Sequence, residues 1–348
     1  MKNGRLAGLD GLRGLAAAGV AVHHIFYHFA AWPLTASPFA QVADWFKVSG
    51  WTLVDLFFLL SGFVFAHVYV PGDPLKSRAG FAEFWVARIA RLYPLHLTML
   101  LLVAIFASNP ANTLTAFAAH LVMAQAFVNP IAGTFVKPAW SISIEMVCYL
   151  IFALAALWPR RGLVWFCVIL AFTAGQYLWI FGPPGGPWAG DSLARGLFGF
   201  FLGQCLWLGR ERLRRVPSWL LVVLVFAGFW LQVGDYSPLV PLTLLAWAPA
   251  LLLGLRLRWL GSPVMVWLGD RSYAIYLINL PLISGVAAVV DVAALTAGQV
   301  IAAHVALLLA ILLASEASFR YLEAPARRAI RSGWDKRQER TALRRAAA

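Results

Sequence analysis

Charged residues are scarce in this chain, and their scarcity excludes an ordinary soluble domain. Asp, Glu, Lys and Arg make up 12% of its 348 residues, whereas soluble proteins average about a quarter. Hydrophobic residues make up 61% of the chain, and its mean hydropathy is +0.75. The short alternating strands of a membrane β-barrel do not appear in the sequence. We therefore predict an all-α, polytopic integral membrane protein.

Cysteine is also rare. Cys148, Cys167 and Cys205 lie inside apolar stretches and have no metal-like spacing, so we expect neither a disulfide framework nor a metal site. The basic N-terminus has no small-residue cleavage site after its apolar run. This favours a retained segment over a signal peptide.

The chain contains long apolar stretches. Their lengths are close to the roughly 20 residues that a transmembrane helix needs. A shorter run, 114–128, contains His120 and Gln125, and we interpret it as a re-entrant or interfacial segment. The others predict about ten transmembrane helices, at 12–31, 51–70, 94–107, 140–158, 163–181, 191–208, 217–234, 238–254, 263–289 and 296–316.

The net charge of +13 is distributed in a way that indicates membrane topology rather than nucleic-acid binding. Lys and Arg cluster before the first span, in 71–93, at 160–161, in 210–215, at 256–258 and beyond 320. If segment 114–128 does not cross the membrane, every cluster lies on the same side of it. The positive-inside rule assigns that side to the cytoplasm. We expect both termini there, with a transmembrane domain over 1–331 and a basic, solvated or headgroup-bound tail over 332–348.

Ionisable groups at membrane depth indicate function because burying a charge there costs at least about 2.5–3.5 kcal/mol. Arg13 and His24 are eleven residues apart, so a helix places them on one face, about 16 Å apart along its axis. An imidazole, with an ordinary pKa near neutrality, suits a general base. We expect function at His24, and packing roles at His23 and His28.

Further polar groups interrupt the apolar runs. Asp55, Glu145 and Arg195 lie within them. Arg88 and Arg91 are three residues apart before Pro94, so they share a helix face and two guanidiniums placed in this way can bind a phosphate. A pair of positive-inside anchors is the alternative interpretation. Ser61 could be a nucleophile, but its apolar Ser-Gly setting favours helix packing.

Five motifs in order resemble the acyltransferase-3 family of membrane acyltransferases, which modify hydroxyls of surface glycans, lipids and antibiotics. LDGLRGLAA leading to His24 resembles the opening Arg–ten residues–His motif of that family. The other motifs, DLFFLLSGF, WVARIARLYPL, WSISIEMVCYL and the closing pair LGDRSYAIYL with FRYLEAPARR, are similar to later ones. The resemblance covers nearly the whole chain. Asn279 departs from it, because the family often has a histidine at this place.

The resemblance implies an O-acyltransferase that moves an acyl group, such as acetyl, from cytoplasmic acyl-coenzyme A to a hydroxyl of an envelope glycan, lipid or small molecule. His24 is then the base, Arg13 and Glu145 belong to the same catalytic site, and Glu145 orients or recharges the imidazole. Arg88 and Arg91 bind acyl-coenzyme A, which is a co-substrate, and no cofactor or metal is permanently bound. We expect contacts to the acceptor from a further set of residues, Asp55, Arg195, Tyr273 and Asn279.

Two alternatives stay open. A proton-coupled transporter could use the same buried His, Glu and Arg as a relay, but transporters usually show repeated halves, and none is visible here. The second alternative is a catalytically silent scaffold. Asn279 slightly favours this alternative, because Asn cannot relay a proton. We place the protein in a membrane, the bacterial inner membrane, with lipids and the two substrates as partners and no nucleic acid.

Overall fold

The computed structural model describes residues 5–29, 39–107, 109–182, 192–231 and 239–346. Within these ranges the chain is helical and contains no strand, which confirms the predicted all-α class. The longer helices are α1 (Ala7–His28), α3 (Ala40–Ser49), α4 (Leu53–Tyr69), α5 (Arg78–Phe106), α6 (Leu114–Leu121), α8 (Trp140–Ala155), α9 (Arg160–Phe181), α10 (Ser192–Leu208), α12 (Ser218–Phe229), α15 (Pro263–Asp270), α16 (Ser272–Ala287), α17 (Ala297–Ser318) and α18 (Ala324–Ala346). The shorter ones are α7 (Asn129–Ala132), α11 (Arg210–Leu213), α13 (Leu239–Leu242) and α14 (Ala248–Gly254).

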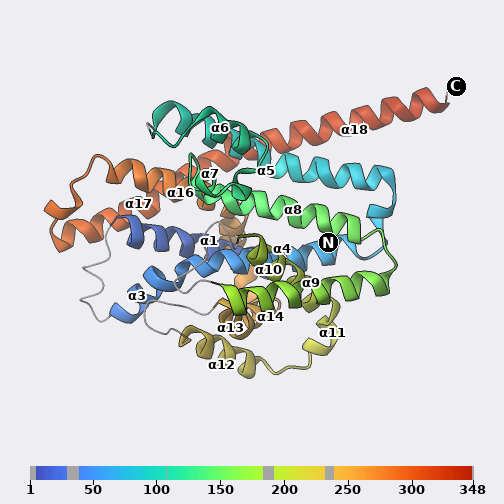
Figure 1. Ribbon diagram of the computed structural model, residues 1–348, viewed down its shortest axis with the longest axis horizontal. Helices are drawn as coiled ribbons and strands as arrows, with labels where there is room; N and C mark the ends of the chain where they lie inside the picture. Colours follow the sequence, from blue (N-terminus) through green and yellow to red (C-terminus); the bar gives the residue numbers. More distant parts are fainter. Residues whose placement is uncertain (1–4, 30–38, 108, 183–191, 232–238, 347–348) are drawn as a thin grey trace.

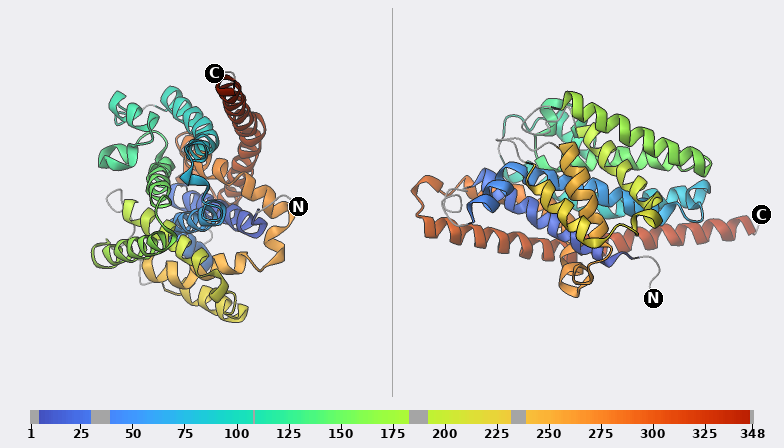
Figure 2. Two further views of the ribbon diagram at one scale, coloured as in Figure 1. Left: turned by 90° about the vertical axis from the view of Figure 1, so that its right-hand side faces the viewer. Right: turned by 90° about the horizontal axis from the view of Figure 1, so that it is seen from below.

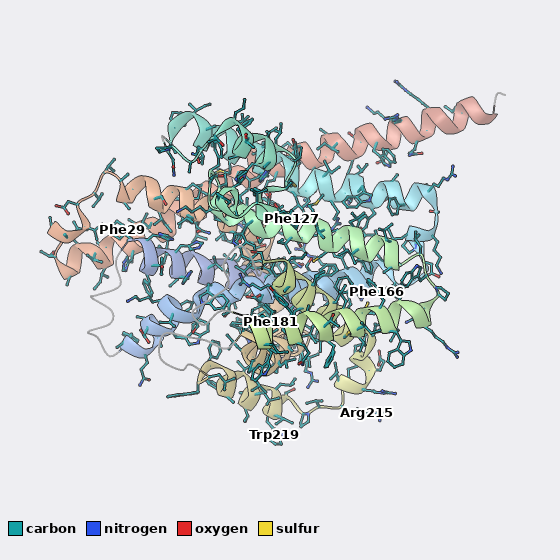
Figure 3. The ribbon with its side chains drawn as sticks, in the orientation of Figure 1. Phe29, Phe127, Phe166, Phe181, Arg215 and Trp219 are labelled. Carbon is teal, nitrogen blue, oxygen red and sulfur yellow. The ribbon has the colours of Figure 1, made fainter. Side chains whose placement is uncertain are left out.

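Several of these helices have the length and composition of membrane spans. Five helical segments of the described chain are long and apolar enough to cross a bilayer: Ala40–Tyr69, Arg78–Phe106, Lys137–Ala155, Arg160–Phe181 and Ala297–Arg340. Four shorter apolar helices accompany them: Ser192–Leu208, Ser218–Phe229, Leu239–Gly254 and Ser272–Ala287. The predicted number of about ten spans stays a prediction. Exposed aromatic side chains such as Phe181 and Trp219 lie on the outer surface (Figure 3).

Helices α1 and α4 form the centre of the bundle, which the end-on view of Figure 2 shows. Helix α4 packs along α10, and α1 packs along α15 and α16. Glycines permit the close approach of α4 to α10. A Cβ added at Gly62 would lie 1.8 Å from the carbonyl oxygen of Phe200, and one at Gly203 would lie 2.1 Å from that of Leu59. Small residues allow membrane helices to pack in this way.

The helix boundaries differ from the predicted spans in two places. Helix α5 starts at Arg78, not at residue 94, and Pro94 lies inside it. The stretch 263–289 is two helices that meet between Asp270 and Ser272. An apolar run reports composition and does not report where a helix starts or turns. The early start of α5 and the break between α15 and α16 could therefore not be predicted from it.

The non-spanning segment and the tail of the prediction can be compared directly with the helices. Helix α6 has 8 residues and is about 12 Å long, too short to cross a bilayer. Helix α17 continues through a π-helical turn, Phe319–Glu323, into α18, and the three form one long rod (Figure 2). The expected tail boundary at residue 332 falls inside α18.

The basic clusters gather at one end of the bundle. Figure 1 shows the turn between α8 and α9, the turn before α5, helix α11 and the outer end of α18 all toward the right-hand side. These segments contain Arg160, Arg161, Lys76 and Arg212. The loop between α16 and α17 lies at the opposite end (Figure 1). The fold therefore separates charge along the helix axes, as a membrane protein requires.

Candidate active site

A cavity of about 300 Å³ lies among six helices in the middle of the bundle. Helices α1, α4, α5, α8, α16 and α18 contribute its wall. The charged side chains that line it are five arginines and a single carboxylate, so the cavity is strongly cationic. They are Arg13, Arg88, Arg91, Arg327, Arg331 and Glu145.

Arg88 is held in the cavity wall by aromatic rings. Its guanidinium carbon lies 4.9 Å from the ring centre of Phe65 and 5.8 Å from that of Tyr149. Its Nη2 donates to the hydroxyl of Tyr69 at 3.4 Å. Its Nε is buried and has no hydrogen-bond partner among the described residues. Because a buried guanidinium nitrogen without an acceptor is costly, this donor indicates a site for an anionic ligand.

Glu145 is bound by hydroxyl groups and not by a histidine. The hydroxyl of Ser61 donates to its Oε1 at 2.7 Å, and the hydroxyl of Tyr149, one helical turn along α8, donates to the same oxygen. The structure therefore places Glu145 in the arginine cavity, where it does not orient His24 as the sequence led us to expect. Ser61 also differs from its expected packing role, because Gly62 makes the close helix contact and Ser61 binds the carboxylate.

Arg13 lines the same cavity from the start of α1. Its Nη1 donates to Oδ1 of Asp10 at 3.1 Å. Arg5 binds the other oxygen of Asp10 at 2.6 Å and Oδ1 of Asp270 at 2.6 Å. The hydrogen bond to Asp10 raises the pKa of Arg5. These ion pairs fix the beginning of α1 against α15 and hold Arg13 on the cavity side.

A small polar cluster forms part of the cavity wall. Ser141 and Tyr276 both line the cavity. The hydroxyl of Ser141 donates to that of Tyr276 at 2.9 Å, which in turn donates to the carbonyl of Pro138 at 2.9 Å. Tyr273 also lines the cavity and donates to the carbonyl of Leu92 at 2.7 Å. The two tyrosine hydroxyls of α16 are therefore held by hydrogen bonds to the backbone of neighbouring segments.

His24 contacts Asn279 of α16. Its Nδ1 is 2.5 Å from Oδ1 of Asn279, and Asn279 is bonded to the backbone carbonyl of Tyr276. The rings of His23 and His28 flank it, with centroids 5.3 and 5.8 Å away. His24 is partly exposed and, among the described residues, is not part of the cavity wall. Arg13 therefore lines the arginine cavity and His24 does not, but Asn279 links His24 to Tyr276, which is part of the cavity wall.

Asp55 and Arg195 bind each other. Two hydrogen bonds, of 3.0 and 2.6 Å, join Arg195 to the two carboxylate oxygens, and both side chains are 2% exposed. Trp51 and Trp140 stack on the guanidinium at 5.0 and 4.9 Å. The expected acceptor contacts therefore lie apart: this pair is saturated, Tyr273 lines the arginine cavity, and Asn279 holds His24.

Comparison with known proteins gives the family. A family model described as an acyltransferase domain matches residues 6–315. The chain belongs to this acyltransferase family. It is 26% identical over 328 residues to the acyltransferase MdmB of Streptomyces mycarofaciens, with 80% of this chain and 79% of that protein covered. It is 23% identical over 368 residues to the peptidoglycan O-acetyltransferase OatA of Listeria monocytogenes, with 92% of this chain and 55% of that protein covered. No solved structure matches the chain.

Family membership confirms the predicted enzyme class, and together with the apolar helices it makes this acyltransferase an integral membrane protein. The arginines that the sequence analysis proposed, Arg88 and Arg91, lie in the cavity beside Arg13. Arg327 and Arg331 were missed because the basic cluster beyond residue 320 was interpreted only as a signal of membrane topology. Their spacing of four residues, which places them on one face of a helix, was the available signal.

The arrangement can do two separate things chemically. The arginine cavity can bind an anion of several charges, with Arg91 and Arg331 near Arg88 and little competing negative charge. Outside the cavity wall, His24 offers an imidazole whose Nδ1 is paired with Asn279, which is the setting of an oriented base. An acyl transfer needs both functions, a site for the donor and a base for the acceptor.

Proposed function

We propose that this acyltransferase is a membrane O-acyltransferase that moves an acyl group, such as acetyl, from acyl-coenzyme A to a hydroxyl of an envelope glycan, a lipid or a small molecule. The observation that carries the proposal is the cavity with five arginines, whose wall residue Tyr276 is linked to His24 through Asn279. The donor is a co-substrate, and no cofactor stays bound between turnovers. Relatives whose names record O-acetylation of peptidoglycan support transfer to oxygen of a glycan.

The charge of the cavity supports coenzyme A as the donor. Coenzyme A carries phosphate groups at one end and the thioester at the other. Arginine binds phosphate oxygens through pairs of N–H groups, and Arg88 has an unpartnered Nε to offer. A volume of about 300 Å³ is at the small end of ligand pockets. It takes the narrow pantetheine arm, while the nucleotide stays at the mouth beside Arg327 and Arg331.

The distribution of basic residues supports the direction of the reaction. The basic turns and the end of α18 lie at the same end of the bundle (Figure 1), and the positive-inside rule assigns such an end to the cytoplasm. Acyl-coenzyme A then enters from the cytoplasm at α18. The acceptor approaches His24 from the opposite face of the bacterial inner membrane.

The transfer itself proceeds by direct attack. The imidazole of His24 removes the hydroxyl proton of the acceptor while the oxygen attacks the thioester carbonyl. A carbon–oxygen bond forms, the carbon–sulfur bond breaks, and the thiolate leaves with the electron pair and regains a proton from the imidazolium through solvent. Because His24 is not part of the cavity wall and Asn279 links it to the cavity-lining Tyr276, side chains of this wall have to move for the thioester to reach the base.

The first test follows thiol release from acetyl-coenzyme A by the purified protein in detergent. Arg91→Ala and Arg331→Ala remove contacts that are equal in ground and transition states, so the donor KM should rise with kcat little changed. Charge-assisted contacts contribute roughly 1.5–3 kcal/mol each, which corresponds to a rise on the order of ten- to a hundredfold. Arg215→Ala is the matched control, because Arg215 is exposed beside α11 (Figure 3). Equal donor KM values in all variants would refute the donor site.

The second test addresses the base. His24→Gln should lower kcat by about 10²–10⁴, the usual contribution of a general base, and leave the donor KM unchanged. His23→Gln is the control, because His23 is its neighbour on α1 and its Nδ1 contacts the backbone carbonyl of Phe46 at 2.9 Å. Normal turnover in a folded His24→Gln protein would exclude this mechanism.

A further inference from the structure

The amide of Asn279 faces His24 with its oxygen. Asn279 is completely buried, and its Nδ2 donates to the backbone carbonyls of Ile275 and Tyr276, both at 2.8 Å. Its Oδ1 lies 2.5 Å from Nδ1 of His24. Turning the amide over would place its oxygen against two carbonyls, which only accept, and both hydrogen bonds would be lost inside a buried site. The backbone of α16 therefore fixes the orientation of this amide.

That orientation determines which nitrogen of His24 carries the proton. An amide oxygen only accepts hydrogen bonds, so Nδ1 of His24 has to donate. A neutral imidazole has one N–H group, and the other nitrogen then carries the lone pair. The neutral ring is thus held as the Nδ1–H tautomer, and Nε2 is the nitrogen that can take a proton.

We infer that Asn279 is a positioning residue, which holds His24 in the tautomer whose Nε2 removes the proton of the acceptor hydroxyl. The inference rests on the proposed role of His24 as the base. When Nε2 takes the proton, the ring becomes cationic, and the Nδ1–H hydrogen bond to Asn279 becomes a stronger, charge-assisted one. Asn279 therefore stabilises the imidazolium as the proton is transferred, and it needs no proton of its own to do so.

This role differs from the expected one, in which Asn279 contacts the acceptor. An oriented base needs a third group that fixes its ring and its tautomer, and an uncharged acceptor is sufficient for this. Asn279 is buried and bonded at both ends of its amide, so it contacts the base in place of the acceptor substrate.

The tautomer can be observed without any turnover. Protein labelled with ¹⁵N in its histidine rings is studied by NMR in detergent at a pH about two units above the ordinary histidine pKa of about 6.5. The spectrum of the His24→Gln variant identifies the His24 signals by their absence. We expect Nδ1 of His24 to be protonated and Nε2 to be unprotonated, and in Asn279→Leu we expect a mixture of tautomers. A protonated Nε2 in the unaltered protein would overturn the inference. The proposed acyl transfer is tested separately, by the thiol-release assay.

Kinetics distinguish positioning from a structural role of the same side chain. Asn279→Leu removes the acceptor oxygen and should lower kcat by roughly 10- to 100-fold, less than loss of the base itself, with both KM values unchanged. Asn279→Asp keeps an oxygen for Nδ1 but loses both donors to the α16 carbonyls, so it should keep kcat within about tenfold of the unaltered enzyme. An Asp variant as impaired as the Leu variant would show that an acceptor oxygen facing Nδ1 is not what Asn279 supplies, and would overturn the inference. If Asn279→Leu fails to fold, the kcat of the Asp variant and the His24 tautomer of the unaltered protein still test the inference.

Discussion

The pair formed by Asp55 and Arg195 predicts a large and specific loss of stability when either partner is removed. Both side chains are 2% exposed and are joined by two hydrogen bonds. Removing one partner leaves the other as a buried, uncompensated charge, which costs about 3–5 kcal/mol. Asp55→Leu and Arg195→Met should each lower the free energy of unfolding by this amount. The double variant replaces the pair by apolar side chains and should lie within about 1–2 kcal/mol of the unaltered protein.

The assay is a double-mutant cycle by equilibrium unfolding in detergent micelles, followed by tryptophan fluorescence. The exposed pair of Arg214 and Glu211, 3.3 Å apart, is the control and should show no measurable coupling. The reasoning fails if the double variant is as unstable as either single one. It also fails if Arg195→Met stays stable but has a raised KM for the acceptor, because Arg195 would then be a substrate contact, as its sequence context first indicated.

Three further predictions concern packing, topology and pH. Gly203→Leu should destabilise the protein by at least about 1–3 kcal/mol in thermal unfolding, because its Cβ would lie 2.1 Å from the Leu59 carbonyl oxygen. In intact cells, an impermeant thiol reagent should label Val289→Cys, in the loop between α16 and α17, and not Ser332→Cys, in α18, because this loop and the outer end of α18 lie at opposite ends of the bundle (Figure 1). Burial lowers the pKa of His120, in the non-spanning helix α6, to about 4, so the unfolded state binds its proton first. The free energy of unfolding should therefore fall between pH values of about 6.5 and 4, by up to roughly 3 kcal/mol.

Each of these predictions has a control in the same chain. Gly298→Leu meets no atom within 4 Å and should leave the melting temperature nearly unchanged. The labelling requires replacement of Cys205, which is only partly buried, and labelling at Ser332→Cys with protection at Val289→Cys would reverse the topology. His120→Gln should remove the acid-dependent part of the loss, and an unchanged pH dependence in that variant would exclude His120 as its source.

Much of the fold and part of the site could be predicted from local sequence. Helix periodicity placed Arg13 and His24 on one face, and three-residue spacing placed Arg88 and Arg91 together, because both are properties of a single helix. The helical class followed in the same way from composition.

What could not be predicted depends on contacts between residues far apart in the chain. His24 meets Asn279 across 255 positions, and Asp55 meets Arg195 across 140. These residues pair because α1 packs on α16 and α4 packs on α10. The spacing of residues along the sequence does not show which helices pack together. For the same reason Glu145 was expected beside His24, whereas the packing of α8 on α4 brings it to Ser61. Arg327 joined the site only because α17 continues straight into α18.

The cluster of Ser141, Tyr276 and the Pro138 carbonyl has a consequence for the energy supply of the cell. An enzyme that takes one reactant from each face of an energised membrane holds two aqueous vestibules, and any continuous file of water between them would conduct protons. In this chain the hydroxyls of Ser141 and Tyr276 in the cavity wall are bonded to one another and to the backbone, so under the proposed two-sided reaction they are not free to join such a file. We therefore expect a variant such as Tyr276→Ala to increase proton leakage across the bilayer even where acylation continues.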